Sequence, residues 1–85
     1  MALTVAFTRR GEKEFLELAL VDRNRIRERL LAYAAEPDHP RHDLRPVIGT
    51  DDVLRMRSGV WRVLFVREAT RVSVQRVLHR REAYR

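Results

Sequence analysis

Hydrophobic and polar residues alternate near the start of the chain, which predicts a β-strand over residues 3–7. Leu3, Val5 and Phe7 occupy every second position, and smaller or polar residues lie between them. A period of two places these three side chains on one face of a strand. We therefore expect the chain to open with a strand that is buried on one side.

The spacing of apolar residues becomes helical after this strand. Thr8 is a suitable N-cap for a first helix over residues 9–20, where apolar residues recur at helical spacing. Asp22 is a suitable N-cap for a second helix. The second helix would bury a stripe formed by Ile26, Leu30, Tyr33 and Ala34. Residues 36–50 contain all three prolines, so they cannot continue the helix and are expected to form a surface connection.

Three further strands are predicted at about residues 52–57, 60–66 and 71–78, joined by short turns. The element order is then β-α-α-β-β-β. This order is typical of an α+β fold with two N-terminal helices packed on one face of a small, mostly antiparallel sheet. A length of 85 residues predicts one domain, residues 1–85, with a thin core.

The first hairpin of this sheet separates arginines from apolar side chains. A two-residue turn at Ser58-Gly59 would place Arg55 opposite Arg62. One face would carry the alternating positions Val53, Arg55, Arg57, Val60, Arg62 and Leu64. The other face, formed by Leu54, Met56, Trp61, Val63 and Phe65, is the predicted core.

A second hairpin is expected to turn at residues 67–70. It would add Ser73, Gln75, Val77 and His79 to the arginine face, and Val72, Val74 and Leu78 to the core. Arg55 and Arg62 would then be like charges directly opposite each other, which costs a few tenths to ~1 kcal/mol. Such a cost indicates a face kept for an anionic ligand. The alternative is a set of solvated surface arginines.

The charge balance favours a polyanionic partner. Lys and Arg number 18 against 12 Asp and Glu, the formal charge is +6, and Lys13 is the only lysine. The planar guanidinium of arginine suits bidentate phosphate contacts. With no cysteine, the chain has no disulfide, thiol nucleophile or thiolate zinc site.

Other classes of site and location receive little support from the sequence. The first residues are too short for a signal sequence and no apolar run approaches ~20 residues, so we expect a cytoplasmic protein with no membrane contact. A metal site at Asp38, His39, His42 and Asp43 is disfavoured because the proline-rich loop offers no third imidazole. We assign no metal and no cofactor.

Three segments resemble the RelE/ParE superfamily of toxins from bacterial toxin–antitoxin pairs, over nearly the whole chain. They are the strand at Val5–Thr8 with the two helices and the Pro37–Pro40 connection that follow it, the basic and apolar run of residues 54–65 that contains Trp61 and Arg62, and the close of residues 77–84. The family often has glycine directly before the aromatic residue, whereas here Val60 stands there and Gly59 comes one place earlier. The resemblance implies a toxin whose partner is a cognate antitoxin.

Members of this superfamily differ in activity. RelE-like members cut messenger RNA in the ribosomal A site, whereas ParE-like members poison DNA gyrase, and the fold does not choose between them. Arg62, Arg81 and Tyr84 match the arginines and the terminal tyrosine of the RNA-cleaving branch. We therefore expect a ribosome-dependent endoribonuclease that inhibits translation. The alternatives are a gyrase inhibitor and a non-catalytic co-repressor that reaches operator DNA only through the antitoxin complex.

Metal-independent cleavage of RNA defines the roles of the candidate residues. A base must deprotonate the ribose 2′-hydroxyl, and cations must stabilise charge on the phosphorus. Tyr84 or His79 is the expected base, although a frayed terminal tyrosine and an inert strand-end histidine are the plain alternatives. By resemblance, Arg81 clamps phosphate and donates a proton. The full expected set is catalytic Arg62, Arg81, Tyr84 and His79, and phosphate-binding Arg55, Arg57, Arg80 and Gln75.

Overall fold

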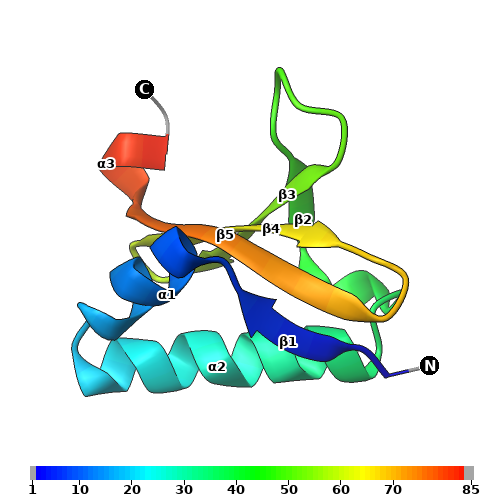
Figure 1. Ribbon diagram of the computed structural model, residues 1–85, viewed down its shortest axis with the longest axis horizontal. Coiled ribbons are helices and arrows are strands. Elements are labelled where there is room, and N and C mark those ends of the chain that lie inside the picture. Colours follow the sequence, from blue (N-terminus) through cyan, green and yellow to red (C-terminus); the bar gives the residue numbers. More distant parts are fainter. Residues whose placement is uncertain (1, 84–85) are drawn as a thin grey trace.

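The computed structural model describes residues 2–83 and has two layers, a sheet and a pair of helices (Figure 1). The elements are β1 (Thr4–Phe7), α1 (Arg9–Leu16), α2 (Leu20–Ala35), a 3-10 turn η1 (Pro40–His42), β2 (Leu44–Pro46), β3 (Val53–Ser58), β4 (Trp61–Arg67), β5 (Arg71–His79) and α3 (Arg80–Ala83). The five strands lie in the order β1-β5-β4-β3-β2. The predicted α+β class is confirmed, and the short strand β2 and helix α3 are additions to it.

The core lies between α2 and the sheet. Ile26, Leu30 and Tyr33 of α2 are at most 1% exposed, and they face strand residues such as Met56 and Phe65, which are fully buried. The Tyr33 and Phe65 rings lie 5.0 Å apart. Full burial of each such apolar side chain is worth about 1.5–3 kcal/mol. Both the predicted helix stripe and the predicted core face of the first hairpin are therefore confirmed.

The boundary between the two helices differs from the prediction. Thr8 caps α1 as expected, since its Oγ1 accepts a hydrogen bond of 3.1 Å from the Gly11 amide. However, α1 ends at Leu16 and α2 begins at Leu20, so the prediction of Asp22 as N-cap is wrong. Asp22 lies inside the first turn of α2, where its negative charge favours the positive end of the helix dipole.

The turn between β3 and β4 is formed by Gly59 and Val60. Ser58 is paired with Trp61, and Gly59 has φ of 59°, which a glycine adopts without the steric cost of a side chain. A positive φ at the first central residue is the requirement of a type II′ hairpin turn. Arg62 therefore lies opposite Arg57, and the predicted pairing of Arg55 with Arg62 is wrong. The difference is two residues along β4, so each side chain stays on its predicted face.

A β-bulge in β5 overturns part of the second predicted register. Phe65 pairs with Val74, but the preceding residue of β4, Leu64, pairs with Arg76, so Gln75 is an extra residue in β5. Beyond it the alternation is reversed. Leu78 faces Arg62, whereas His79 lies on the Trp61 side. The prediction that Gln75, Val77 and His79 lie beside Arg62 is wrong, and Val77 is 4% exposed in the core.

The two sides of the sheet are unlike. Helices α1 and α2 lie along one side, and α3 and the loop between β2 and β3 project from the other (Figure 1). The side with the projections carries the arginines of the first hairpin. Within residues 2–83, no helix is both long and apolar enough to cross a membrane.

Candidate anion-binding site

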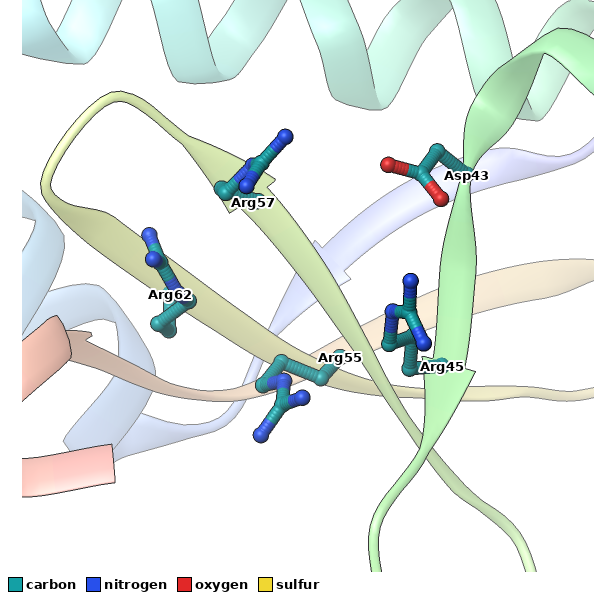
Figure 2. A pocket seen from close by; sticks show the side chains of 5 residues that line it. All are labelled: Asp43, Arg45, Arg55, Arg57 and Arg62. Carbon is teal, nitrogen blue, oxygen red and sulfur yellow. The ribbon is translucent and has the colours of Figure 1, made fainter. Parts of the chain in front are cut away.

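Four arginines from three neighbouring strands line one small pocket. Arg45 comes from β2, Arg55 and Arg57 from β3, and Arg62 from β4, while Asp43 stands just before β2 (Figure 2). The cavity measures about 70 Å³. Because a water molecule in the liquid takes up ≈ 30 Å³, the pocket has room for a small group such as a phosphate. The predicted residues Arg55, Arg57 and Arg62 are thus brought together.

The strand pairing opposes these arginines in two like-charged pairs. Arg45 lies opposite Arg55 across β2 and β3, and Arg57 lies opposite Arg62 across β3 and β4. Like charges directly opposite in a sheet destabilise it by roughly 0.2–1 kcal/mol a pair. The sheet therefore bears this cost twice at one place, where an anion would remove it.

Arg62 is the buried member of the pocket, with 5% of its surface exposed. Its Nη1 donates hydrogen bonds of 2.9 Å to the carbonyl oxygens of Gly59 and Trp61. The turn that sets the strand register thus also holds the Arg62 guanidinium. Its side chain is ordered before any ligand arrives, which lowers the entropy cost of binding.

Among the described residues, Asp43 is the one carboxylate that lines the pocket. Its φ of 48° is left-handed, a conformation that aspartate tolerates better than most residues, and it ends the η1 turn. Within residues 2–83, the side chains of Asp43, Arg45 and Arg57 form no hydrogen bond or ion pair. Figure 2 shows the Asp43 carboxylate turned toward the space between Arg45 and Arg57. It can therefore accept a hydrogen bond from a ligand.

His42 holds the segment that carries Asp43. The imidazole is 6% exposed, and its Nε2 donates a hydrogen bond of 2.6 Å to the Glu36 carbonyl oxygen. The ring lies edge-on to Tyr33, and Arg29 donates to the His42 carbonyl. In the described part of the chain, no group of three or more His, Asp or Glu side chains is close enough to hold a metal ion. His42 therefore acts as an anchor for the loop.

Two of the predicted catalytic residues lie in a different hollow. His79 and Arg81 line it with Trp61 and Glu82, where β4 begins and β5 ends. His79 Nδ1 accepts a hydrogen bond of 3.2 Å from the Arg81 amide and so caps α3, and its ring lies edge-on to Trp61. Neither residue lines the arginine pocket.

The remaining predicted residues are also outside the pocket. The Gln75 side chain donates a hydrogen bond of 3.2 Å to Ser73 Oγ at the bulge. Arg80 is exposed, and its amide donates to the Val60 carbonyl, which ties the start of α3 to the first hairpin turn. Tyr84 lies outside the described residues.

Arg45 and Asp43 were missed as phosphate-site residues by the sequence analysis. The only signal for Arg45 is the short alternation of residues 44–46, and Pro46 within it argues against a strand. The sequence suggests Asp43 only as a metal ligand, because nothing in it places this residue beside the first hairpin.

Comparison with known proteins identifies the family. A family model described as the ParE toxin of the type II toxin–antitoxin system parDE matches residues 5–84. This chain belongs to that toxin family. Among curated proteins, none matches it.

Solved toxin structures share the fold. The toxin is similar to the RelB–RelE antitoxin–toxin complex of Methanococcus jannaschii, with a TM-score of 0.76, 20% identity, and 93% of this chain and 94% of that chain covered. It is also similar to the RelE–RelB complex of Pyrococcus horikoshii, with a TM-score of 0.75 and 21% identity, and 94% of this chain and 97% of that chain are covered. A variant of E. coli RelE with two arginines replaced, in the free state, matches with a TM-score of 0.75 and 24% identity, and 99% of this chain and 92% of that chain are covered.

The family model is named for ParE and these structures are named for RelE. The comparisons therefore confirm the expected RelE/ParE superfamily. At these identities, the structural likeness shows the fold alone.

Proposed function

We propose that this toxin is a metal-independent endoribonuclease that cleaves messenger RNA in the ribosomal A site and so inhibits translation. The observation that carries the proposal is the pocket of four arginines with one carboxylate. Guanidinium groups can donate paired hydrogen bonds to the oxygens of a phosphodiester. They can also stabilise the charge that develops on five-coordinate phosphorus.

Asp43 favours RNA over DNA as the ligand of this pocket. A carboxylate repels phosphate but accepts a hydrogen bond from a hydroxyl, and the 2′-hydroxyl is the group that distinguishes RNA. In the proposed step, Asp43 takes the 2′-hydroxyl proton as the 2′-oxygen bonds to phosphorus. The P–O5′ bond breaks with its electron pair on the 5′-oxygen, which takes a proton from water or from Arg81. Asp43 thus joins Tyr84 and His79 as a candidate base.

The ribosome has a defined part in this proposal. The pocket offers one carboxylate and no described imidazole, so acid–base catalysis by the free toxin is expected to be weak. Binding in the A site would orient the RNA backbone against the arginines and supply much of the rate through positioning. The toxin would therefore act in the cytoplasm on translating ribosomes.

A cognate antitoxin follows from the family, and we propose that it covers the arginine face. The net charge of +6 favours an acidic partner. Val60 is 42% exposed next to Arg62 and can anchor an apolar side chain of the antitoxin. Operator DNA would be reached only through the complex.

Inhibition of DNA gyrase is the second candidate, because the matching family model is that of ParE. Binding to gyrase would need an exposed basic surface but no phosphate-sized pocket. The third candidate is a co-repressor without toxicity.

Toeprinting of messenger RNA on programmed ribosomes tests these proposals. The purified wild-type toxin should produce cuts in the A site and leave gyrase supercoiling unchanged. A double variant, Arg45→Gln with Arg57→Gln, should lose the cuts, because both side chains are exposed and line the pocket. Arg25→Gln, an exposed arginine of α2, is the matched control and should cut normally.

The variant Asp43→Asn tests the proposed base. Loss of a general base typically lowers a rate by 10²–10⁴-fold, so cutting should slow by about 100-fold or more. RNA affinity should be unchanged or higher, because a negative charge is removed. Inhibition of gyrase without A-site cuts would replace the nuclease proposal with the ParE-like one, and a chain inactive in both assays would support the co-repressor.

A further inference from the structure

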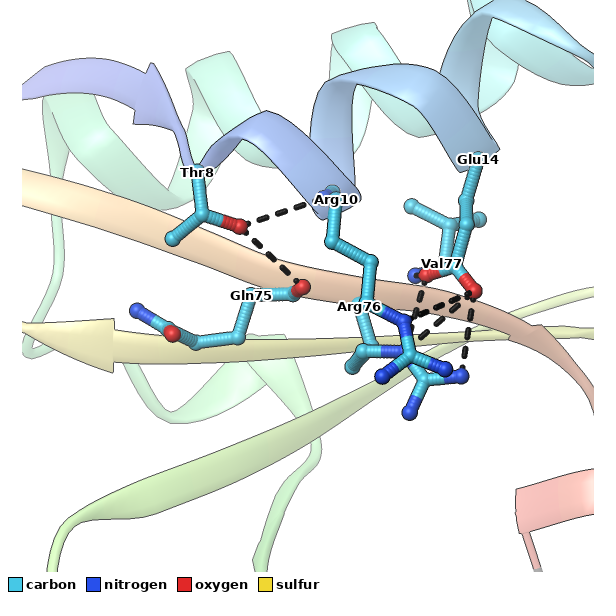
Figure 3. Close-up of polar contacts among 7 residues, drawn as sticks. Thr8, Arg10, Glu14, Gln75, Arg76 and Val77 are labelled. Carbon is cyan, nitrogen blue, oxygen red and sulfur yellow. Dashed lines mark hydrogen bonds and ion pairs between the residues drawn. The ribbon is translucent and has the colours of Figure 1, made fainter.

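The edge of β5 changes its partner at the bulge. β1 pairs with β5 only from Arg71 to Val74. Past that point, α1 takes over the contact with the strand edge: the Thr8 amide donates to the Val74 carbonyl at 2.9 Å, and Thr8 Oγ1 donates to the Gln75 carbonyl at 3.2 Å. The bulged residue is thus held by the first residues of the helix (Figure 3).

Glu14, six residues after Thr8, continues this contact with β5. Its Oε1 accepts hydrogen bonds of 3.0 Å from both Arg76 Nε and the Val77 amide, and its Oε2 accepts one of 3.1 Å from Arg76 Nη2 (Figure 3). The side chain of Glu14 is 19% exposed and that of Arg76 is 29% exposed. A bidentate, partly buried pair that also binds a backbone amide is far more specific in geometry than a surface ion pair.

Gly11 is what allows α1 to approach so closely. A Cβ atom at this position would lie 2.5 Å from the Val74 carbonyl oxygen, which belongs to the backbone and cannot move aside cheaply. Residues three apart lie on the same face of a helix, so the contact of Gly11 brings Glu14 against β5. We call the set Thr8, Gly11 and Glu14 with its β5 partners the bulge clamp.

Glu14 is charged at neutral pH in this setting. Burial raises the pKa of its carboxyl, but the hydrogen bonds from Arg76 and the Val77 amide, with the charges of Arg76 and Arg10, outweigh burial and lower it. The clamp is therefore fully formed under physiological conditions.

The bulge decides which side chains reach the arginine face. Because Gln75 is an extra residue, Leu78 lies directly opposite Arg62 and is 8% exposed, while His79 faces Trp61 and caps α3. Loss of the extra residue from the strand would reverse these positions and turn α3 away from its present side.

We propose that Glu14 is a positioning residue: by holding Arg76 and the Val77 amide it fixes the bulge, and so sets Leu78 against Arg62 and directs α3, with Arg81, into its present place at the end of β5. This inference rests on the proposed nuclease function for its activity readout, but its structural readout is independent. Glu14 itself touches neither pocket.

The variant Glu14→Ala in the full chain tests the proposal, with Glu17→Ala as the matched control. Glu17 is the exposed C-cap residue of α1, and its side chain forms no hydrogen bond or ion pair with the described residues. In Glu14→Ala, hydrogen exchange of the Val77 amide, followed by NMR, should speed up at least tenfold relative to the amides of β4. On programmed ribosomes, kcat should fall by roughly 10–100-fold, since misplacement by about 1 Å can cost 10² in rate. KM should change little, because the pocket arginines are intact.

A second pair of variants separates charge from the amide contact. Glu14→Gln keeps an oxygen acceptor for the Val77 amide, so it should retain more activity than Glu14→Ala. Exchanging the charges in a Glu14→Arg, Arg76→Glu double variant restores an ion pair without that acceptor, and should fail to restore kcat.

Several outcomes would overturn the inference. One is that Glu14→Ala keeps both the wild-type exchange rate of the Val77 amide and the wild-type kcat. The other is that activity falls while protection from exchange is lost equally throughout β4 and β5, which would show that Glu14 acts only on general stability. If the wild-type toxin does not cut RNA, the nuclease proposal fails, while the exchange of Val77 still confirms or contradicts the clamp.

Discussion

Arginine is used in opposite ways in two regions of this toxin. In the bulge clamp, Arg76 meets the carboxylate of Glu14 through three hydrogen bonds between their side chains. In the pocket, four arginines surround a single carboxylate, Asp43, which forms no ion pair with any described residue. The first arrangement satisfies its charges within the fold. The second accumulates positive charge, as a site for an external anion does.

The comparison shows that the number of arginines is a poor guide to function. The chain is rich in arginine throughout. What separates the two regions is strand register, because pairing sets Arg45 against Arg55 and Arg57 against Arg62, whereas the bulge turns Arg76 toward a helix. A charged residue is a candidate for ligand binding when its neighbours share its sign.

The largest effect on stability is expected from adding a side chain at Gly11, where α1 lies against β5. Alanine in a helix is normally more stable than glycine by roughly 0.5–1 kcal/mol. Here the added Cβ would meet the Val74 carbonyl at 2.5 Å, so Gly11→Ala should lower the free energy of unfolding by about 1–3 kcal/mol. Urea unfolding followed by circular dichroism would measure it. Arg25→Ala, at an exposed site of α2, should change the free energy of unfolding very little. An equally small change in Gly11→Ala would contradict the close contact of α1 with β5 at the bulge clamp.

The next largest effect is expected on RNA affinity, when a second carboxylate is added to the pocket so that its arginines are paired as Arg76 is in the clamp. Arg45→Glu would place a carboxylate opposite Arg55. A hydrogen bond to a charged group is worth ≈ 1.5–3 kcal/mol, so affinity for a short single-stranded RNA should fall at least about tenfold. Fluorescence anisotropy would measure it. An equal fall in Arg25→Glu would show that binding depends only on net charge and not on the pocket.

The clamp should also give stability a specific dependence on pH. The lowered pKa of Glu14 means that its contribution is fully present above the unfolded-state value of ~4.3, and is lost as the pH falls through the folded-state value. Wild-type toxin and Glu14→Gln should therefore differ in free energy of unfolding at pH 7 and converge in strongly acidic solution. A constant difference across this range would contradict the charged contact.

The smallest expected effect is a gain in stability from the pocket. Arg57→Gln removes the repulsion with Arg62 and should raise the free energy of unfolding by a few tenths of a kcal/mol. The same variant should reduce by about 1 the slope of log affinity for RNA against log salt concentration. A loss of stability would show that Arg57 supports the fold and is not kept for a ligand.

The fold class and the buried faces could be predicted because alternation in β3 and β4 is regular. The turn could not, since glycine at Ser58-Gly59 or at Gly59-Val60 leaves the same faces buried. The bulge was hidden for another reason: Val77 and Leu78 are adjacent and both apolar, so either could be assigned to the core. Only the neighbouring helix, through Gly11 and Glu14, shows why the strand changes its alternation.

Three of the pocket residues could be predicted and two could not. Arg55, Arg57 and Arg62 follow from the alternation of one hairpin. Arg45 and Asp43 depend on β2, a strand of three residues that exists because it pairs with β3 and not because of its own composition. Long-range pairing of this kind leaves little trace in a local pattern.

The parallel strand β1 also affects how the chain reaches its native state. The pairing of Val5 in β1 with Val72 in β5 joins residues 67 positions apart, whereas the arginine hairpin of β3 and β4 closes over a two-residue turn. Closing a long loop is slower than closing a short one, and contacts of high sequence separation slow folding. During translation, β1 can pair with β5 only after β5 has been synthesised. We therefore expect a folding intermediate in which the β3–β4 hairpin is formed and the edge of the sheet is unpaired. An antitoxin present at that stage can bind this intermediate before the toxin is fully folded.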